Sequence, residues 1–138
     1  PLTLEEALAA LARGSAASVS LSGRGIGDQG AERLADALER NDTVTSLDLF
    51  RNRIGDDGAA RLAAALELEG AVRSLDLAGN DVGDEGAERL LAALERNSTV
   101  TSLDLSGNHV GDECAARLAA TLARNRAGVR VATVRCSL

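Results

Sequence analysis

The stretch LDLFRNRIGD at residues 47–56 decides the fold. Close copies occur at residues 75–84 (LDLAGNDVGD) and 103–112 (LDLSGNHVGD), each 28 residues after the last, and a weaker copy, VSLSGRGIGD, occupies residues 19–28. Self-similarity at a fixed period of roughly 20–50 residues is typical of a solenoid, in which each unit buries its apolar side against its neighbours. The sequence therefore predicts a repeat architecture.

Each unit is predicted to contain a short strand followed by a helix. Leu47 and Leu49 are separated by one residue, and this period of two predicts a very short strand with both leucines pointing inward. Further along the unit, Ala59, Leu62 and Leu66 follow the i, i+3, i+7 spacing of one buried helix face. Strand and helix are therefore expected to alternate along the chain.

Charged side chains surround the predicted helix starts. The Asp of each Gly-Asp pair is expected to be the N-cap, because its carboxylate can accept from the free amides of the first turn. The residues concerned are Asp56, Asp84 and Asp112. An acid followed four residues later by Arg also predicts an i,i+4 ion pair on the outer side of each helix. These pairs are Asp57–Arg61, Glu85–Arg89 and Glu113–Arg117.

The repeat pattern L-x-x-L-x-L-x-x-N-x-I/V-G-D-x-G-A-x-x-L-A-x-x-L resembles the leucine-rich repeat family. A 28-residue unit with a full helix is similar to the ribonuclease-inhibitor-like class, which includes the repeats of NOD-like receptors, and the I-G-D-x-G-A-x-x-L stretch also resembles repeats of bacterial effectors. The resemblance implies an α/β fold. The expected architecture is a right-handed leucine-rich-repeat solenoid, a short horseshoe with parallel strands on the concave face and helices on the convex face.

The whole chain, residues 1–138, is interpreted as a single domain. The predicted divisions are an N-terminal helix or cap at 1–15, repeats at 16–43, 44–71, 72–99 and 100–127, and a partial fifth repeat at 128–138. Thr3 and Glu6 have the spacing of a capping box at the start of the first helix. Terminal repeats need a polar outer surface, whereas Val129, Val131 and Val134 are apolar. Either the array continues or another molecule covers that end.

Composition limits the classes of partner. The net charge of −6 and the single aromatic residue, Phe50, argue against nucleic acid as a ligand, which needs a basic face or stacking rings. No apolar run reaches the length of a membrane span, and no secretory leader is recognised. Two cysteines make no disulfide framework. We therefore expect a cytoplasmic protein, and the Arg-only, Ala-rich composition favours a bacterial source. An effector would act in the host cytoplasm.

Motifs that could carry chemistry are weak. Residues 25–30 (GIGDQG) match G-x-G-x-x-G formally, but Gly27 and Gly30 are repeat positions, and the carboxylate of Asp28 would repel a pyrophosphate. His109 is expected to be a solvated loop residue, because it has no nucleophile or metal partner in sequence. Cys114 takes a glycine position as a tolerated buried thiol. The sequence predicts no enzyme, no metal and no cofactor.

The outward positions of the strands are the candidate site. They contain Ser46, Ser74 and Ser102 in one row and Asp48, Asp76 and Asp104 in the next, about 4.8 Å apart from strand to strand. The Asp row is either an acidic surface for a basic peptide or protein, or a common solvated choice at this position. Asn52, Asn80 and Asn108 form a separate row that is expected to be structural, bonding loop carbonyls between units.

Phe50 is the residue to test first. Its position holds Ser or Ala in the other repeats, which favours surface placement over the core, and Arg51 and Arg53 flank it. Aromatic and arginine side chains are typical of binding hot spots. The predicted protein-binding residues are Ser46, Asp48, Phe50, Arg51, Arg53, Ser74, Asp76, Ser102, Asp104 and His109.

Two functional hypotheses follow. The first is a protein-protein interaction module that binds a protein or peptide on its concave face, as part of a larger sensor or a bacterial effector. The alternative is a self-associating structural unit that forms a homodimer through Val129, Val131 and Val134 at its uncapped C-terminal end.

Overall fold

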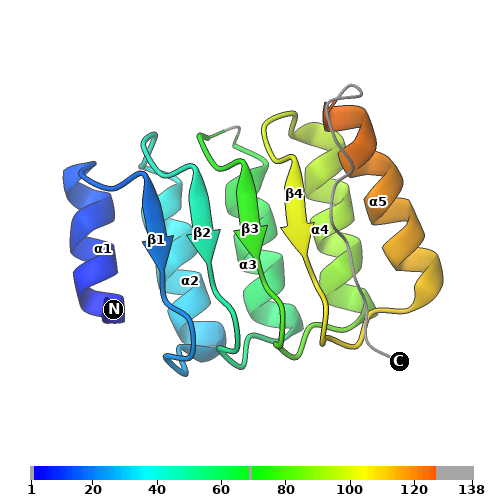
Figure 1. Ribbon diagram of the computed structural model, residues 1–138, viewed down its shortest axis with the longest axis horizontal. Helices are drawn as coiled ribbons and strands as arrows, with labels where there is room; N and C mark the ends of the chain where they lie inside the picture. Colours follow the sequence, from blue (N-terminus) through cyan, green and yellow to red (C-terminus); the bar gives the residue numbers. More distant parts are fainter. Residues whose placement is uncertain (1, 69, 127–138) are drawn as a thin grey trace.

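The computed structural model describes residues 2–68 and 70–126, in which one helix precedes four strand–helix units (Figure 1). The elements are α1 (Leu4–Arg13), β1 (Ser18–Ser20), α2 (Gly27–Leu38), β2 (Ser46–Asp48), α3 (Asp56–Leu66), β3 (Ser74–Asp76), α4 (Asp84–Arg96), β4 (Ser102–Asp104) and α5 (Asp112–Arg126). Successive strands begin 28 residues apart, as the repeat period predicts.

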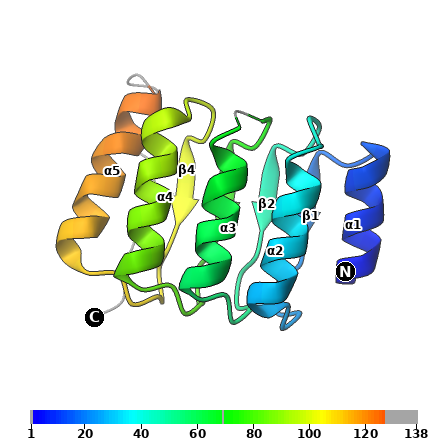
Figure 2. The same ribbon diagram turned by 180° about the vertical axis from the view of Figure 1, so that it is seen from behind.

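The four strands form one parallel sheet in chain order, β1-β2-β3-β4. Each residue pairs with the residue 28 positions later, for example Leu47 with Leu75 and Asp48 with Asp76. The helices cover one face of this sheet, and none of the described helices or strands covers the opposite face (Figures 1 and 2). This arrangement confirms the predicted α/β solenoid with strands on one side and helices on the other.

Leucines fill the layer between sheet and helices. Leu47 and Leu49 are at most 1% exposed, which confirms that both point inward from the β2 segment. Ala59 and Leu62 are equally buried on the inner face of α3, and Leu66 is 6% exposed. Burial of one such Leu side chain is worth about 1.5–3 kcal/mol, so the stacked leucine rows supply most of the stability of a fold with a single aromatic ring.

The Asn row links neighbouring units, as expected. Asn80 donates from Nδ2 to the carbonyl of Leu49 at 3.0 Å, and its Oδ1 accepts from the amides of Asn52 and Ile54 at 2.9 and 3.0 Å. Asn108 repeats the pattern, donating to Leu77 at 2.8 Å. These buried amides satisfy backbone groups of the preceding loop, so they belong to the framework.

The predicted N-caps are wrong. The residues that precede α3 and α4 as N-caps are Gly55 and Gly83, and neither cap has a side-chain hydrogen bond. Asp56 and Asp84 are instead the first residues of their helices, and α5 likewise begins at Asp112. A carboxylate on the first helical residue lies one position beyond the N-cap, so it is not placed to accept from the free amides of its own first turn.

The same carboxylates bind the next repeat. Asp28 Oδ1 accepts from the amides of Gly55 at 2.7 Å and Gly58 at 3.0 Å, one unit later. Asp56 bonds the amides of Gly83 and Gly86 at the same two distances. Each Asp therefore caps the following helix across the repeat boundary, and this supplies the acceptor that a glycine N-cap lacks.

Two of the three ion pairs predicted within helices are replaced by pairs between helices, and the third, Glu85–Arg89, is not formed among the described residues. Arg61 of α3 bonds Asp36 of α2 rather than Asp57 of its own helix. Arg117 of α5 bonds Glu88 of α4 at 2.7 Å rather than Glu113. Because the helices lie side by side, a long Arg side chain reaches the neighbouring helix more directly than its own next turn.

At the N-terminal end, the Thr3–Glu6 capping box of α1 is confirmed, with bonds of 3.0 and 3.2 Å.

Among the described residues, no helix is long and apolar enough to cross a bilayer. The predicted partial repeat at 128–138 and its residues Val129, Val131 and Val134 lie outside the described residues.

Candidate functional site

The uncovered face of the sheet, called the concave face below, is formed by the outward residues of the four strands and the loops that follow them. Ser46 and Asp48 flank the buried Leu47 in β2, and β3 and β4 have the same pattern of half-buried, buried and half-buried residues. The two predicted rows of Ser and Asp therefore share one surface. Their members, aligned by strand register, are Ser46, Ser74 and Ser102, then Asp48, Asp76 and Asp104.

Each Asp of the row closes the turn after its strand. Asp48 Oδ1 accepts from the amide of Phe50 at 3.0 Å, and Asp76 Oδ1 accepts from the amide of Ala78 at 2.9 Å. Asp104 accepts from both the amide and the hydroxyl of Ser106, at 2.9 and 2.7 Å. This is the turn geometry that Asp favours, so one carboxylate oxygen of each Asp has a structural role.

Asp76 occupies the centre of the row. Its pKa is raised above the ordinary value, first because burial disfavours the charged form, and further because the carboxylates of Asp104 and Asp48 lie nearby. The hydrogen bond from the amide of Ala78 opposes that rise in the pKa. A cation brought to this row would relieve repulsion that the protein alone does not cancel.

Phe50 lies on the surface at the end of β2, half-buried. The guanidinium carbon of Arg51 is 5.0 Å from the centroid of its ring, the geometry of a cation–π contact. Gly79 of the next loop leaves room for this pair, because a Cβ there would lie 2.8 Å from Arg51 Cγ and 3.4 Å from Phe50 Cε1. The pair is therefore held in place by the neighbouring repeat.

Arg51 and Arg53 both have left-handed backbone, with φ of 55° and 59°. They are the non-glycine residues with positive φ in the described part of the chain. The positions equivalent to Arg51 in the other units hold Gly23, Gly79 and Gly107, all with positive φ. The turn needs a conformation that suits glycine, and this unit alone places Arg in it.

The profile of the leucine-rich repeat family matches residues 40–63, 72–91 and 96–119. The chain is a leucine-rich repeat protein. Its fold is similar to that of actin-binding site 2 of leiomodin-1, with a TM-score of 0.80 and 22% sequence identity over 100% of this chain and 81% of that chain.

A second similar structure is the tropomodulin C-terminal domain from structural genomics of Caenorhabditis elegans, with a TM-score of 0.80 and 16% identity over 99% of this chain and 84% of that chain. A search of curated protein sequences returned no match. The ribonuclease-inhibitor-like subclass and the similarity to NOD-like receptors stay predictions.

Other features of this leucine-rich repeat protein are structural. Asp28 of the G-x-G-x-x-G stretch is bonded to the amides of Gly55 and Gly58, so its carboxylate sits where a phosphate would have to approach. His109 is an exposed loop residue whose amide donates to the carbonyl of Val82 at 2.8 Å. It lies in the loop after β4, outside the Phe50 loop.

An acidic cleft of about 340 Å³ lies between the starts of α4 and α5. Asp84, Glu88 and Glu113 line it, together with Cys114 and Arg117. Within residues 2–68 and 70–126, no group of three or more His, Cys, Asp or Glu side chains is arranged to hold a metal ion. Burial and the nearby Glu88 raise the pKa of the Cys114 thiol to about 11, so the thiol stays protonated at neutral pH.

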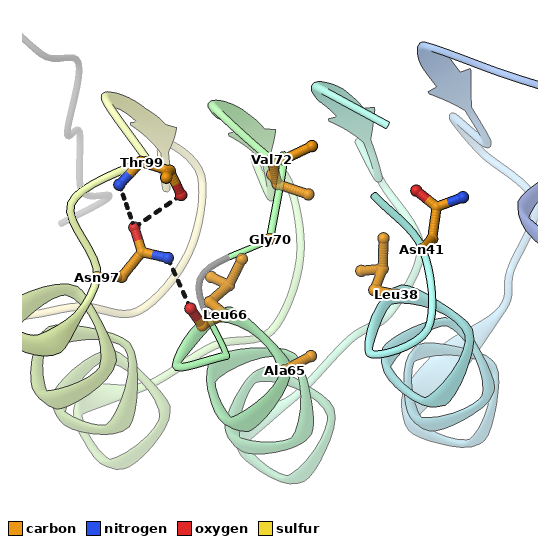
Figure 3. Close-up of a pocket in the computed structure, with 9 residues that line it drawn as sticks. Leu38, Asn41, Ala65, Leu66, Gly70, Val72, Asn97 and Thr99 are labelled. Atoms are coloured by element: carbon orange, nitrogen blue, oxygen red, sulfur yellow. Dashed lines mark hydrogen bonds between the residues drawn. The ribbon is translucent and has the colours of Figure 1, made fainter. Parts of the chain in front are cut away.

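A smaller cavity of about 10 Å³ lies where α2 and α3 end, lined by Leu38, Leu66, Val72 and neighbours (Figure 3). Asn97 stands at its edge, donating to the carbonyl of Leu66 at 2.6 Å and accepting from the amide of Thr99 at 2.7 Å. This volume is enough for one water molecule at most. The cavity therefore offers no site for an organic ligand.

The sequence predicted the rows of Ser and Asp on the surface, but it did not predict the contacts that fix the side chains at the end of β2. It did not predict the bond from Asp48 to the amide of Phe50 or the contact between Phe50 and Arg51. The signal for the first was present, because an Asp two residues before a loop amide is a common turn-forming arrangement. The left-handed backbone at Arg51 was also foreseeable, since Gly occupies that position in the other repeats.

Proposed function

We propose that this leucine-rich repeat protein is an interaction module that binds a partner protein on its concave face. The observation that carries the proposal is the Phe50–Arg51 pair, an aromatic ring that stays half-exposed with a guanidinium stacked against it. Aromatic and arginine side chains carry a large share of the binding energy at protein interfaces. A ring of this size at the edge of a surface otherwise made of Ser and Asp is a suitable anchor.

The Asp row supplies the electrostatic part of the proposal. Asp48, Asp76 and Asp104 lie in register on adjacent strands, and the pKa of the central carboxyl is raised first by burial and further by the two neighbouring carboxylates. A Lys or Arg side chain of a partner would be attracted to this row and would lower that repulsion. The partner segment is therefore proposed to carry at least one basic residue opposite the row.

Similarity to solved structures supports the class of function. The structure of leiomodin-1 that resembles this chain is described as an actin-binding site, so the same fold serves protein binding in that protein. We infer a binding role without enzymatic activity for this chain too. The cytoplasmic location and the bacterial or effector origin stay predictions from the sequence.

The experiment is selection of a random-peptide display library on the immobilised chain, followed by fluorescence-polarisation titration of the enriched peptides. Phe50→Ala is expected to weaken binding by about tenfold or more, as loss of a hot-spot aromatic does. Glu32→Ala is the control, because Glu32 is exposed on α2 at the opposite face. It should leave the affinity unchanged.

Two outcomes would overturn the proposal. One is the absence of any peptide enriched over the bare support. The other is an equal loss of affinity in Phe50→Ala and Glu32→Ala, which would move the binding site away from the concave face. Circular dichroism melting curves of both variants confirm that each is folded before titration.

The alternative function, self-association through Val129, Val131 and Val134, stays a prediction because those residues lie outside the described part of the chain. Sedimentation equilibrium over a range of concentrations tests it directly. A monomer mass at the highest concentration would exclude the homodimer, and the display experiment is unaffected by that result.

A further inference from the structure

Several arginines on the helices are paired with carboxylates of a neighbouring unit. Arg33 bonds Glu5 at 2.7 Å, Arg96 bonds Glu67 at 3.2 Å, and Arg117 bonds Glu88 at 2.7 Å. Arg51 and Arg53 are both exposed, and neither has an ion pair with any residue in 2–68 or 70–126. Arg73 and Arg89 share this property singly, whereas Arg51 and Arg53 lie two residues apart in one loop. Two cations therefore stand side by side in one loop with their charge uncompensated.

The equivalent loop of the first unit shows what a structural arginine looks like in this fold. Arg24 donates from Nε to the carbonyl of Leu2 at 2.9 Å and from Nη1 to the carbonyl of Ser22 at 3.0 Å. Its guanidinium ties the loop to the N-terminal segment. Arg51 and Arg53 make no such bonds with the described residues, so their side chains do not hold the loop together.

The backbone at both positions is unfavourable for any residue with a Cβ. Glycine occupies the equivalent of Arg51 in the other three units, and Gly25 takes the position of Arg53 with the same sign of φ. Non-glycine residues held in this conformation cluster at ligand-binding sites. The arginines thus add local strain while forming no ion pair within the described part of the chain.

Phe50 fixes the direction of one of the two cations. With its guanidinium 5.0 Å from the ring centroid, Arg51 has one face covered while its N–H edge stays available. A guanidinium presents its donors in a planar fork that matches the two oxygens of a carboxylate. The stacked Arg51 is therefore pre-arranged to donate to an anion beside the ring.

We propose that Arg51 and Arg53 form a carboxylate-binding site beside Phe50, occupied by an Asp or Glu side chain of the partner protein. The inference rests on the proposed function, which places a basic residue of the partner opposite the Asp row, and it adds an acidic residue of the partner at Arg51 and Arg53. Because Asp48 is the last residue of β2 and Phe50 follows two residues later in the loop, the surface changes from acidic to basic along β2 and its loop. The matching partner segment has a basic side chain opposite the Asp row, an apolar one on Phe50, and then a carboxylate.

A polyanion fits this surface less well than one carboxylate. A nucleic acid or an anionic membrane would bring further negative charge against the Asp row and against a chain of net charge −6. The site is therefore assigned to an isolated acidic side chain within a segment of mixed charge.

The test uses peptides enriched on the wild-type chain in the display selection. We compare the wild type with the double variants Arg51→Gly/Arg53→Gly and Arg51→Lys/Arg53→Lys. Glycine with positive φ is native at the position of Arg51 in the other units and, as Gly25, at the position of Arg53 in the first unit, so the first variant removes the charge with a residue that suits the turn. The second retains the charge and loses the planar fork. Melting curves confirm that both are folded.

The enriched peptides are expected to contain Asp or Glu at one defined position. Replacing that residue by Ala should lower affinity about tenfold for the wild type, and less than about twofold for the glycine variant, which has no cation left to lose. The lysine variant should fall between them, because Lys offers a point charge without the bidentate geometry.

Enriched peptides without an acidic position, or with an acidic residue whose replacement weakens the glycine variant as much as the wild type, would overturn the assignment while leaving concave-face binding intact. Equal binding of heparin and the acidic peptide, lost together in the glycine variant, would also overturn it in favour of a general anion site. Absence of any enriched peptide would instead contradict the proposed function itself.

Discussion

Asp56 Oδ1 accepts a hydrogen bond from the amide of Gly83, 2.7 Å away in the next repeat. A second bond, from the amide of Gly86 at 3.0 Å, makes this carboxylate the cap of a helix that begins 28 residues after its own. The approach depends on glycine, because a Cβ on Gly86 would lie 2.7 Å from the same oxygen. Adjacent repeats are thus coupled by a charged acceptor as well as by leucine packing.

The fourth unit has one hydrogen bond fewer in this contact between repeats. Cys114 replaces the glycine, and Asp84 bonds the amide of Gly111 at 2.7 Å without the second bond that Asp56 makes. Asp56→Ala should therefore lower the free energy of unfolding by about 2 kcal/mol and Asp84→Ala by about 1 kcal/mol. Urea denaturation followed by circular dichroism measures both.

Asp57→Ala is the matched control, because it removes an acid from the same first turn with no hydrogen bond from the next unit. It should cost only the helix-dipole contribution, about 0.3–1 kcal/mol. Equal losses in all three variants would mean that the carboxylates act through the helix dipole and that the bonds between repeats contribute nothing.

Cys114 is predicted to be unreactive. Its pKa of about 11 against the ordinary 9.0 reduces the thiolate fraction about 100-fold below pH 9. Alkylation by iodoacetamide in a Cys136→Ser background should therefore be far slower in native protein than in urea. The native rate should rise with pH up to about pH 11.

The sign of the effect of pH on stability follows from the same shift. Below pH 9 the thiol is protonated in both states, and between about 9 and 11 the unfolded chain loses the proton while the native chain keeps it. Stability should therefore decline as pH rises through this window. A Cys114→Ala variant should lack that decline, and a native alkylation rate equal to the unfolded one would refute the burial of the thiol.

Arg51 and Arg53 are expected to reduce stability. Left-handed backbone costs about 1–3 kcal/mol at each non-glycine residue, while glycine makes the unfolded chain more flexible by about 0.4–1 kcal/mol. The Arg51→Gly/Arg53→Gly variant should therefore gain about 1 kcal/mol or more in the free energy of unfolding. Urea denaturation checks the gain.

Arg73→Gly is the control for this gain, because Arg73 is exposed and does not have positive φ. It should lose stability through the flexibility of the unfolded chain alone. A loss of stability in the double variant similar to that in the control would show that the loop stores no strain.

Asp76→Asn should raise stability at neutral pH. Asparagine keeps an oxygen to accept from the amide of Ala78 and removes a charge that burial, Asp104 and Asp48 all disfavour. Because the native pKa of Asp76 is raised, its contribution favours the folded state at low pH and is lost as pH rises through that pKa. The variant should therefore show a flatter dependence of stability on pH just above the ordinary Asp range.

Asp42→Asn, at an exposed loop residue, supplies the comparison in the same urea titrations. The gain in stability should accompany weaker binding of basic peptides, because the central charge of the row is missing. A variant that is no more stable than the wild type and still binds equally well would leave the Asp row with only its turn-forming role.

The repeat period predicted the fold because every unit solves the same packing problem with the same residues. Leu47, Leu75 and Leu103 could be placed in one buried row from spacing alone. Hydrogen bonds between polar groups of adjacent units could not be predicted in this way. A carboxylate such as Asp28 is expected to bond its own helix on local rules, and only the stacking geometry brings Gly55 and Gly58 within reach.

At the candidate site too, the exposure of a residue could be predicted from the sequence, whereas its side-chain contacts could not. Exposure of Phe50 could be inferred because Ser and Ala share its position in other repeats. The stacking of Arg51 on its ring could not, since rotamers on an open surface are set by neighbours such as Gly79 in the adjacent loop. The paired acid of Arg61 was misassigned for a similar reason, because helix-to-helix distance is a property of the assembled solenoid.

Binding on the concave face is tested most directly by chemical-shift mapping on the ¹⁵N-labelled chain with an enriched peptide. The account predicts that amide resonances of residues 46–53, 74–79 and 102–107 shift while those on the outer faces of α2, α3 and α4 do not. Shifts confined to those helices, with the amides of Phe50 and Arg51 unchanged, would contradict it.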